Sequence, residues 1–324
     1  MRAAWYEQQG PARQVLKLGT MNDPLPGTDE VRIRVAASGL NPGDIKKRQD
    51  TFGYGMPYPR VIPHTDGAGV VDLVGPGVPS EWVGRRVWVH GAQTYRPFGT
   101  AAEYTVVPAR QAVPLPDNVS MDQGACFGIP CLTAHRAVHA AGSVDGRTVL
   151  VHGGAGSVGV CASQFARRSG ARVIATIRAP RDEATALAAG AHHVLLNDER
   201  LSRQARALAP QGVDHIIEVA FGANVRTDLD LLATGGSIAA YATDIAEPAL
   251  PFWPLLFKNT RIFLLGSDDF TDDARQAAVR AVSDALADGW TAFEISARFP
   301  LEDIASAHEW LEQPSRRGRA VVTL

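Results

Sequence analysis

The sequence predicts an α/β protein of two domains, one rich in β-strands and one built on a doubly wound parallel sheet. A chain of 324 residues exceeds the size at which one hydrophobic core usually keeps growing. Up to about residue 116, short alternating segments are separated by glycine and proline, whereas strongly apolar segments then alternate with helical patterns. We therefore expect a β-rich domain over 1–120, completed by 268–324, and a parallel-sheet domain over 121–267.

The first domain is expected to consist of antiparallel strands. In 31–35 the apolar side chains fall on one face, and 85–89 and 103–107 repeat this pattern. Proline and glycine at 24–27 and 75–77 mark turns between such strands.

The second domain repeats a strand and helix unit, which is typical of a parallel sheet. Strands are expected at 148–151, 172–177, 193–196, 215–219, 237–241 and 262–265. Helices are expected over 158–168 and 273–287, each followed by a glycine. A last helix over 301–312 and a strand over 320–322 should pack back on the first domain.

The composition indicates a globular protein whose partner is a small molecule. Hydrophobic residues make up 45% of the chain and the net charge is -2. The chain has no block of lysine or arginine that would suggest nucleic acid or an anionic membrane as a partner. Charged residues near the start of the chain interrupt any apolar segment there. No later segment approaches the roughly 20 apolar residues of a membrane span. We expect a cytoplasmic protein.

A complete G-x-G-x-x-G motif, Gly154 to Gly159, follows the first expected parallel strand and opens a helix. In this context the glycines allow a tight turn whose N–H groups meet a pyrophosphate at the positive end of the helix dipole. The alternative is a glycine-rich turn that binds nothing. The expected cofactor contacts in the turn are Gly153, Gly154, Ala155, Gly156, Ser157, Val158 and Gly159.

Arg178 stands at the end of the second parallel strand, where proteins that bind NAD usually carry an acidic residue. An arginine suits the 2′-phosphate of NADPH, and Arg181 is close enough in sequence to assist. The alternative is solvent-facing loop charge, which nearby acids could offset. Tyr241, Gly266 and Ser267 follow later strands and are expected to contact the cofactor mostly through backbone.

Four separated segments resemble the quinone oxidoreductase, or zeta-crystallin-like, branch of the medium-chain dehydrogenase/reductase superfamily. They are 39–44, 62–71, 128–134 and 151–159. The resemblance implies a GroES-like catalytic domain, a Rossmann domain, a cleft between them and a homodimer joined through sheet edges. The apolar segment 261–265 is the strand edge we expect in that dimer.

Zinc is not expected. Zinc-dependent relatives place a cysteine where this chain has Asn41, and a Gly-His-Glu where it has 64–66. Its three cysteines, Cys126, Cys131 and Cys161, form no C-x-x-C pair, which argues against a thiolate zinc site and a disulfide framework. Reduction of a conjugated carbonyl compound needs no such metal.

Three residues are candidates for the chemistry. The resemblance implies that Asn41 faces the nicotinamide and the substrate and that Thr133, which we expect to open a helix, hydrogen-bonds the nicotinamide. Asn41 and Asp44 could instead simply cap a helix, and Thr133 could be an ordinary helix residue. Tyr54 lies in a loop of aromatic residues and glycine that suits stacking on a flat ring, although the rings could merely fill space.

Other polar residues are given structural roles. His64, His192, His193 and His215 lack metal-ligand spacing, so we expect them to be structural or solvent-facing. Arg316, Arg317 and Arg319 could hold phosphate or form a solvated tail.

The sequence thus favours hydride transfer from NADPH to a quinone. Reduction of an alkenal or enone double bond is an alternative that these residues do not separate from it. A second alternative is a non-catalytic, crystallin-like protein that keeps the NADPH site.

Overall fold

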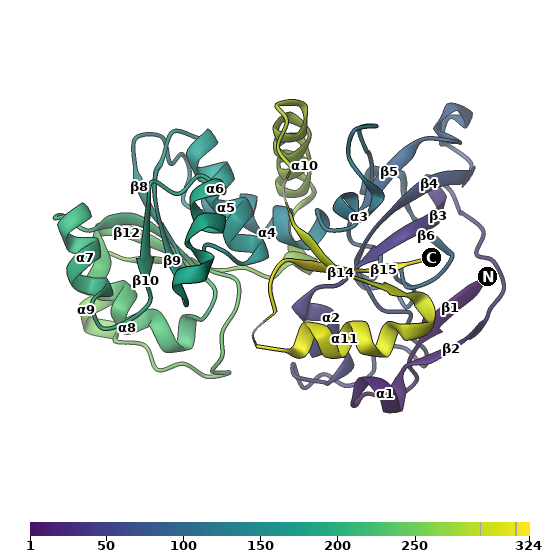
Figure 1. Cartoon of the computed structure of the whole chain (residues 1–324), viewed down its shortest axis with the longest axis horizontal. Helices are drawn as coiled ribbons and strands as arrows, with labels where there is room; N and C mark the ends of the chain where they lie inside the picture. The colour runs from purple at the N-terminus through teal and green to yellow at the C-terminus, as the bar shows by residue number, and fades with distance from the viewer. Residues whose placement is uncertain (292, 315) are drawn as a thin grey trace. The chain divides into compact units, whose positions relative to one another are not determined.

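The computed structural model describes residues 1–291, 293–314 and 316–324. The chain forms two compact units (Figure 1). We call Met1–Ile129 with Ala285–Leu324 the β-rich unit, and Pro130–Asp284 the parallel-sheet unit.

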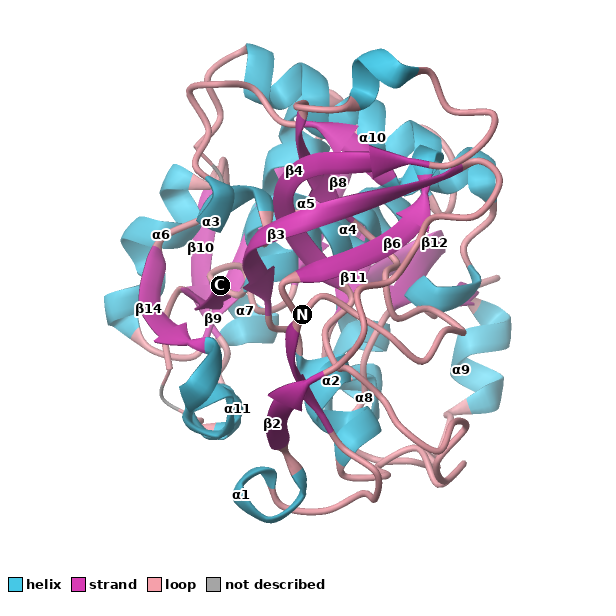
Figure 2. Ribbon diagram, turned by 90° about the vertical axis from the view of Figure 1, so that its right-hand side faces the viewer, coloured by secondary structure: helices cyan, strands magenta, loops and turns pink. Residues whose placement is uncertain are grey.

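A seven-stranded sheet organises the β-rich unit. Its order is β14 (Ile295–Pro300), β15 (Arg319–Thr323), β3 (Glu30–Gly39), β4 (Asp66–Val74), β5 (Arg86–Val89) and β7 (Ala112–Pro114), with β6 (Tyr104–Pro108) paired to β3. Figure 2 shows β4, β3 and β6 side by side. Neighbours are antiparallel except β14 and β15. The antiparallel strands and the return of the tail through the β15–β3 pair are confirmed, whereas β14 was not predicted.

Short elements complete this unit. They are β1 (Arg2–Trp5), β2 (Lys17–Thr20), α1 (Ala12–Val15), α2 (Pro42–Arg48), α3 (Met121–Gly124) and α11 (Ile304–Glu312), with 3-10 turns at Ser80–Trp82, Ala109–Gln111 and Leu301–Asp303. The helix expected over 301–312 is therefore one 3-10 turn followed by α11. Because α3 packs on β3, β4 and β5, the β-rich unit runs to Ile129 and not only to residue 120.

Six parallel strands form the sheet of the other unit. Their order is β10 (His193–Leu196), β9 (Arg172–Ile177), β8 (Thr148–Val151), β11 (Val213–Glu218), β12 (Leu232–Ala240) and β13 (Arg261–Leu264). All neighbouring pairs are parallel, which confirms the predicted sheet. The chain moves outward from β8 to β10 and then returns to β11, so the strand order reverses between β8 and β11. Ligands of such sheets bind outside the carboxyl ends of the strands at this point.

Helices cover both faces of this sheet (Figure 1). The helices in this part of the chain are α4 (Gly128–His139), α5 (Ser157–Arg168), α6 (Glu183–Ala188), α7 (Leu201–Leu208), α8 (Phe221–Leu231), α9 (Phe252–Phe257) and α10 (Asp272–Ala287), the last of which runs past the end of the unit, with 3-10 turns at Pro180–Asp182 and Ser267–Asp269. On the α7 and α8 face, Leu150, Ile174 and Ile216 pack with Leu201 and Phe221 in one buried cluster. Among the described residues, every helix is too short or too polar to cross a bilayer.

Candidate functional site

The glycine-rich turn connects β8 to α5 in the parallel-sheet unit. Gly153 has a φ of +66°, which strongly favours glycine, and Gly156 is the N-cap of α5. A Cβ atom on Gly159 would lie 2.2 Å from the Gly153 carbonyl oxygen, so a side chain there would disrupt the turn. The turn therefore presents backbone at a helix N-terminus, as an anionic ligand requires. Ala155, Ser157 and Val158 lie within the same segment.

The other expected cofactor residues lie after the carboxyl ends of parallel strands. Arg178 follows β9 directly, its side chain is exposed, and within the described part of the chain it forms no hydrogen bond or ion pair. Arg181 is exposed in the 3-10 turn that follows. Tyr241 follows β12 and donates its N–H to the Glu218 carbonyl at 3.1 Å. Gly266 and Ser267 follow β13.

Thr133 lies inside α4 and does not open it. The helix begins at Gly128 and so has Pro130 in its first turn. A proline is tolerated there, because the N–H groups of the first turn have no partner within the helix. The Thr133 side chain is buried, and its Oγ1 has no hydrogen-bond partner among the described residues. A buried hydroxyl without a partner is unfavourable, so a ligand group is one way to satisfy it.

In the β-rich unit, Asn41 is the N-cap of α2, and Asp44 accepts the Asn41 N–H at 2.7 Å. The capping role of Asp44 is thereby confirmed. The Asn41 side chain, which is part of a capping box, has further partners, since Nδ2 donates to Asp66 Oδ2 at 2.7 Å and Oδ1 accepts from Arg319 Nη2 at 3.0 Å. A carboxylate on one side and a guanidinium on the other fix the orientation of the amide.

Asp66 is the buried centre of this group. Its Oδ2 also accepts the Ile129 N–H at 2.8 Å, and its Oδ1 has no hydrogen-bond partner among the described residues. Burial raises the pKa of Asp66 to about 7, against the opposing effect of the hydrogen bonds from Ile129 and Asn41. Arg319 is 3% exposed, so the expectation of a phosphate ligand or a solvated tail is wrong for this residue. It joins a buried polar group because β15 pairs with β3.

Tyr54 lies in the loop after α2. Its ring stacks on Phe52 with centroids 5.7 Å apart, and the two residues are 55% and 51% exposed. Lys46 Nζ lies 5.9 Å from the Phe52 ring. The loop therefore offers an open aromatic surface to a flat ligand.

The four histidines expected to be structural or solvent-facing are so. His64 is buried and has a φ of 75°, with Nδ1 2.7 Å from Ser38 Oγ and Nε2 2.9 Å from His308 Nε2. His215 is buried between Ser237 Oγ and the Ala137 carbonyl. His308, in α11, was not predicted to have any role.

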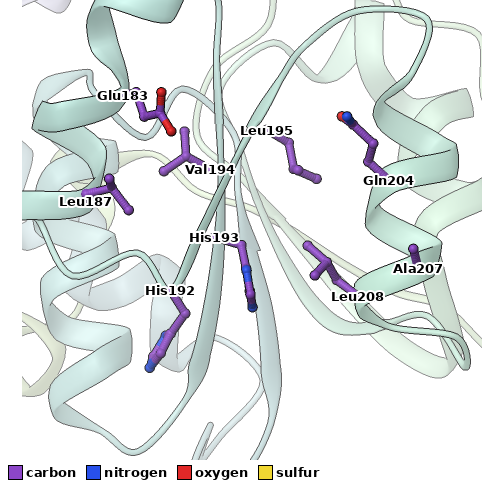
Figure 3. Close-up of a pocket in the computed structure, with 9 residues that line it drawn as sticks. All are labelled: Glu183, Leu187, His192, His193, Val194, Leu195, Gln204, Ala207 and Leu208. Carbon is purple, nitrogen blue, oxygen red and sulfur yellow. The ribbon is translucent and has the colours of Figure 1, made fainter.

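His192 and His193 lie at a hollow of about 460 Å³ on the edge strand β10. Figure 3 shows it between α6, which contributes Glu183 and Leu187, and α7. It contains none of the predicted site residues and lies along a sheet edge, so it is not the predicted cofactor site.

A buried cluster that was not predicted from the sequence lies beside the start of the turn. One ligand atom from each of His152, Glu218 and Asp228 lies within 4.8 Å of the others. His152 follows β8, Glu218 ends β11 and Asp228 lies in α8. A polar residue at the end of an otherwise apolar strand is the sequence signal that could have found His152 and Glu218.

The chain is similar to known proteins over nearly its whole length. Family models match over residues 27–117, described as the alcohol dehydrogenase GroES-like domain, and over 157–284, described as a zinc-binding dehydrogenase. The quinone oxidoreductase of Rattus norvegicus is 31% identical over 326 residues, covering 98% of this chain and 96% of that protein. A mycobacterial protein complexed with NADPH matches with a TM-score of 0.86 and 27% identity over 100% of both chains. An NAD-dependent alcohol dehydrogenase matches with a TM-score of 0.87, also at 27% identity over 100% of both chains.

Proposed function

This chain belongs to the quinone oxidoreductase family of the medium-chain dehydrogenase/reductase superfamily, and on that premise we propose that it transfers hydride from NADPH to a quinone without a metal ion. The observation that carries the proposal is the glycine-rich turn of Gly153 to Gly159, together with the exposed Arg178 directly after the next strand. The similarity to a mycobacterial NADPH complex supports the same cofactor.

The residues of the parallel-sheet unit fit a phosphorylated dinucleotide. The N-terminus of α5 would receive the pyrophosphate, because the first N–H groups of a helix have no partner within the helix. Arg178, with Arg181 beside it, would hold the 2′-phosphate through charge-assisted hydrogen bonds. The unpartnered Thr133 hydroxyl fits a hydrogen bond to the nicotinamide amide. Tyr241, Gly266 and Ser267 complete the proposed set. When bound, NADPH supplies the hydride.

The residues of the β-rich unit would bind and orient the acceptor. Tyr54 offers an exposed ring for stacking on a quinone. Asp66 uses one N–H of the Asn41 amide, which leaves the other for a carbonyl oxygen of the acceptor. The quinone takes one hydride and one proton and becomes a hydroquinone, so the step balances with a proton from water.

The positions of the zinc ligands in zinc-dependent relatives support a reaction without metal. The amide at Asn41 is held by a carboxylate and a guanidinium, and both ring nitrogens of His64 face other side chains. Within the described ranges, the one cluster of three potential ligands is His152, Glu218 and Asp228. Those residues are far in sequence from the positions that bind catalytic zinc in the relatives.

We also propose a homodimer formed through β13. This edge strand pairs only with β12 in the described sheet, and Leu264 at its end is 74% exposed. On the preceding α9, Trp253 and Phe257 are 65% and 74% exposed. An open apolar strand edge beside exposed aromatic rings is a surface that a second copy would cover. Light scattering should give twice the chain mass, and a monomer after Leu264→Lys.

The experiment that tests the function is a screen of NADPH oxidation against quinones, alkenals and alcohols, with and without a chelator. We expect oxidation that depends on a quinone and survives chelation. Faster reaction with alkenals would replace the quinone by an enone as acceptor. Alcohol oxidation that chelation abolishes would overturn the metal-free proposal, and NADPH binding without turnover on any acceptor would indicate a non-catalytic protein.

A further inference from the structure

His152 separates β8 from Gly153, the first residue of the glycine-rich turn. Its side chain is buried, at 1% exposure, although it stands next to a turn that carries backbone toward a ligand. An ionisable ring in such a place needs partners for both nitrogens.

Both ring nitrogens of His152 have partners. Nε2 lies 2.8 Å from Asp228 Oδ1 and 3.5 Å from Glu218 Oε2, and Nδ1 lies 3.0 Å from Thr176 Oγ1. A nitrogen that faces two carboxylates must carry a hydrogen. A proton on the second nitrogen as well gives an imidazolium that donates to Asp228 and to Thr176.

Thr176 connects this ring to the turn. Its Oγ1 is 3.3 Å from the Gly153 nitrogen and accepts that N–H, while its backbone oxygen accepts the Gly154 N–H at 2.8 Å. The first two residues of the turn are thus held by one residue of the neighbouring strand β9. The rotamer of the Thr176 hydroxyl depends in turn on His152.

The carboxylates extend the network across the sheet. Glu218 ends β11, accepts the Ala220 N–H and two contacts from Asn224 Nδ2 at 3.1 and 3.2 Å, and through its backbone oxygen receives the Tyr241 N–H. Asp228 is fully buried in α8, and its Oδ2 has no hydrogen-bond partner among the described residues.

We propose that His152 is the positioning residue of the glycine-rich turn: held as an imidazolium by Asp228 and Glu218, it fixes the Thr176 hydroxyl that receives the Gly153 N–H. This inference rests on the proposed binding of a dinucleotide at the turn. It adds that the proton content of a buried group, which need not touch the cofactor, sets the affinity for it.

The charge of the network explains why affinity should depend on pH. Although burial lowers it, the hydrogen bond to Asp228 and the charge of Glu218 raise the pKa of His152 above its usual value. Burial, with the nearby Asp228, raises the pKa of Glu218 to about 7 despite the attraction of His152. The groups that face Glu218 are His152 from β8, Asp228 from α8 and Tyr241 after β12, and burial raises the pKa of Tyr241 so that it stays neutral. Above pH 7 the network therefore gains one negative charge beside a turn proposed to bind an anion.

The first test compares hydroxyl variants by NADPH titration of the apo protein. Thr176→Val removes the hydroxyl at nearly constant shape and should weaken NADPH binding about threefold to tenfold, since one hydrogen bond is lost. Thr176→Ser should restore it. His152→Gln should weaken binding by a similar factor, whereas the matched control His215→Gln, at an equally buried histidine of the same sheet, should not. In turnover the change should fall on the KM for NADPH and leave kcat within about twofold.

The second test measures protonation directly. Nitrogen-15 NMR of histidine-labelled apo protein should show both His152 nitrogens protonated at pH 7, and Asp228→Asn should remove this signature. The NADPH Kd of the wild type should rise about fivefold to tenfold relative to Glu218→Gln between pH 6 and pH 8. Titration of the 2′-phosphate of the cofactor affects both proteins alike and cancels in this ratio.

The outcomes separate this inference from the proposed function. If the wild type binds no NADPH, the proposed function and the role assigned to His152 both fail. If it binds NADPH but Thr176→Val equals Thr176→Ser, or the ring is neutral at pH 7, the function stands and the positioning role is overturned. A stoichiometric divalent metal that is lost in Glu218→Gln would also overturn it, because the metal and not a proton would then hold the cluster.

Discussion

The two units prepare their ligand contacts in different ways. In the parallel-sheet unit the proposed contacts are mostly backbone groups. They are presented by a turn whose conformation requires glycine. In the β-rich unit the proposed contacts are side chains, and the buried side chains of Asp66 and Arg319 orient Asn41. A backbone site tolerates most side-chain changes around it, except at residues such as Thr176 that hold the turn itself. A side-chain site depends on each buried partner.

Buried histidines show the same contrast. Arg48 Nε donates to His308 Nδ1 at 3.2 Å, so His308 must donate from Nε2 to His64, and His64 from Nδ1 to Ser38. Both rings are therefore neutral, since a further proton would place two N–H groups face to face. His152 instead faces two carboxylates and is favoured as a cation. Burial disfavours the cation at all three rings, and only at His152 do neighbouring carboxylates outweigh it.

Acid should break the β-rich unit through the neutral pair, and this is the largest effect we expect. Burial lowers the pKa of His64 to about 3 and that of His308 well below its usual value, whereas the unfolded chain takes up these protons near pH 6.5. Stability is thus fully present above about pH 6.5 and is lost as the pH falls below it. Lowering the pH from 7 to 5 should reduce the free energy of unfolding by about 4 kcal/mol through these two histidines.

Urea unfolding at several pH values checks this. His308→Gln keeps one hydrogen-bond donor and one acceptor between Arg48 and His64 but has no titrating ring. The free energy of unfolding of this variant should therefore fall by about 2 kcal/mol less over the same pH range. Other histidines contribute equally to both proteins. An unchanged pH dependence in the variant would show that His308 is not held neutral.

Removing Arg319 should be the next largest effect. Arg319→Met leaves Asn41 Oδ1 without its donor and Asp66 without a nearby cation, and should lower the free energy of unfolding by roughly 3 kcal/mol. In the double variant with Asp66→Asn, the two effects should sum to less than their separate values, because the charge that needed compensation is gone. Additive losses in a double-mutant cycle would mean that the two residues do not interact.

In the parallel-sheet unit, one exposed side chain is expected to matter. Arg178→Ala should reduce the preference for NADPH over NADH, expected at roughly tenfold to a hundredfold or about 1.4–2.8 kcal/mol, by weakening NADPH alone. Steady-state kinetics with both cofactors would show it. If Arg181 shares the phosphate, the double variant should lose the rest. Arg203→Ala, an exposed arginine of α7, is the control, and an equal effect there would reduce Arg178 to general surface charge.

The smallest effect is expected at Tyr54. Tyr54→Ala should raise the KM for a bulky quinone about threefold to tenfold, because stacking on one ring contributes about 0.5–1.5 kcal/mol. Tyr54→Phe should keep most of the affinity, and NADPH affinity should not change in either variant. A parallel loss of NADPH affinity would place the loop elsewhere.

The sequence predicted what local patterns determine. The parallel strands, the glycine-rich turn and the position of Arg178 each depend on neighbouring residues, and the strands were found where expected. The partners of Asn41 could not be predicted, because Arg319 lies 278 positions away and only the pairing of β15 with β3 brings it near. His308, 244 positions from His64, was missed for the same reason.

Two local predictions failed for physical reasons. Thr133 was placed at the start of a helix, yet that helix begins at Gly128 and includes Pro130, because a proline fits the first turn of a helix. β14 was missed although its sequence, ISARFP, alternates apolar and polar residues, and it forms a strand by pairing in parallel with β15.

Hydride transfer from NADPH to a quinone without a metal ion can be tested by anaerobic product analysis in the presence of a chelator. We predict that each NADPH consumed yields one hydroquinone, with no semiquinone signal by electron paramagnetic resonance. Semiquinone as the main product, or no oxidation of NADPH with any quinone, would contradict the account.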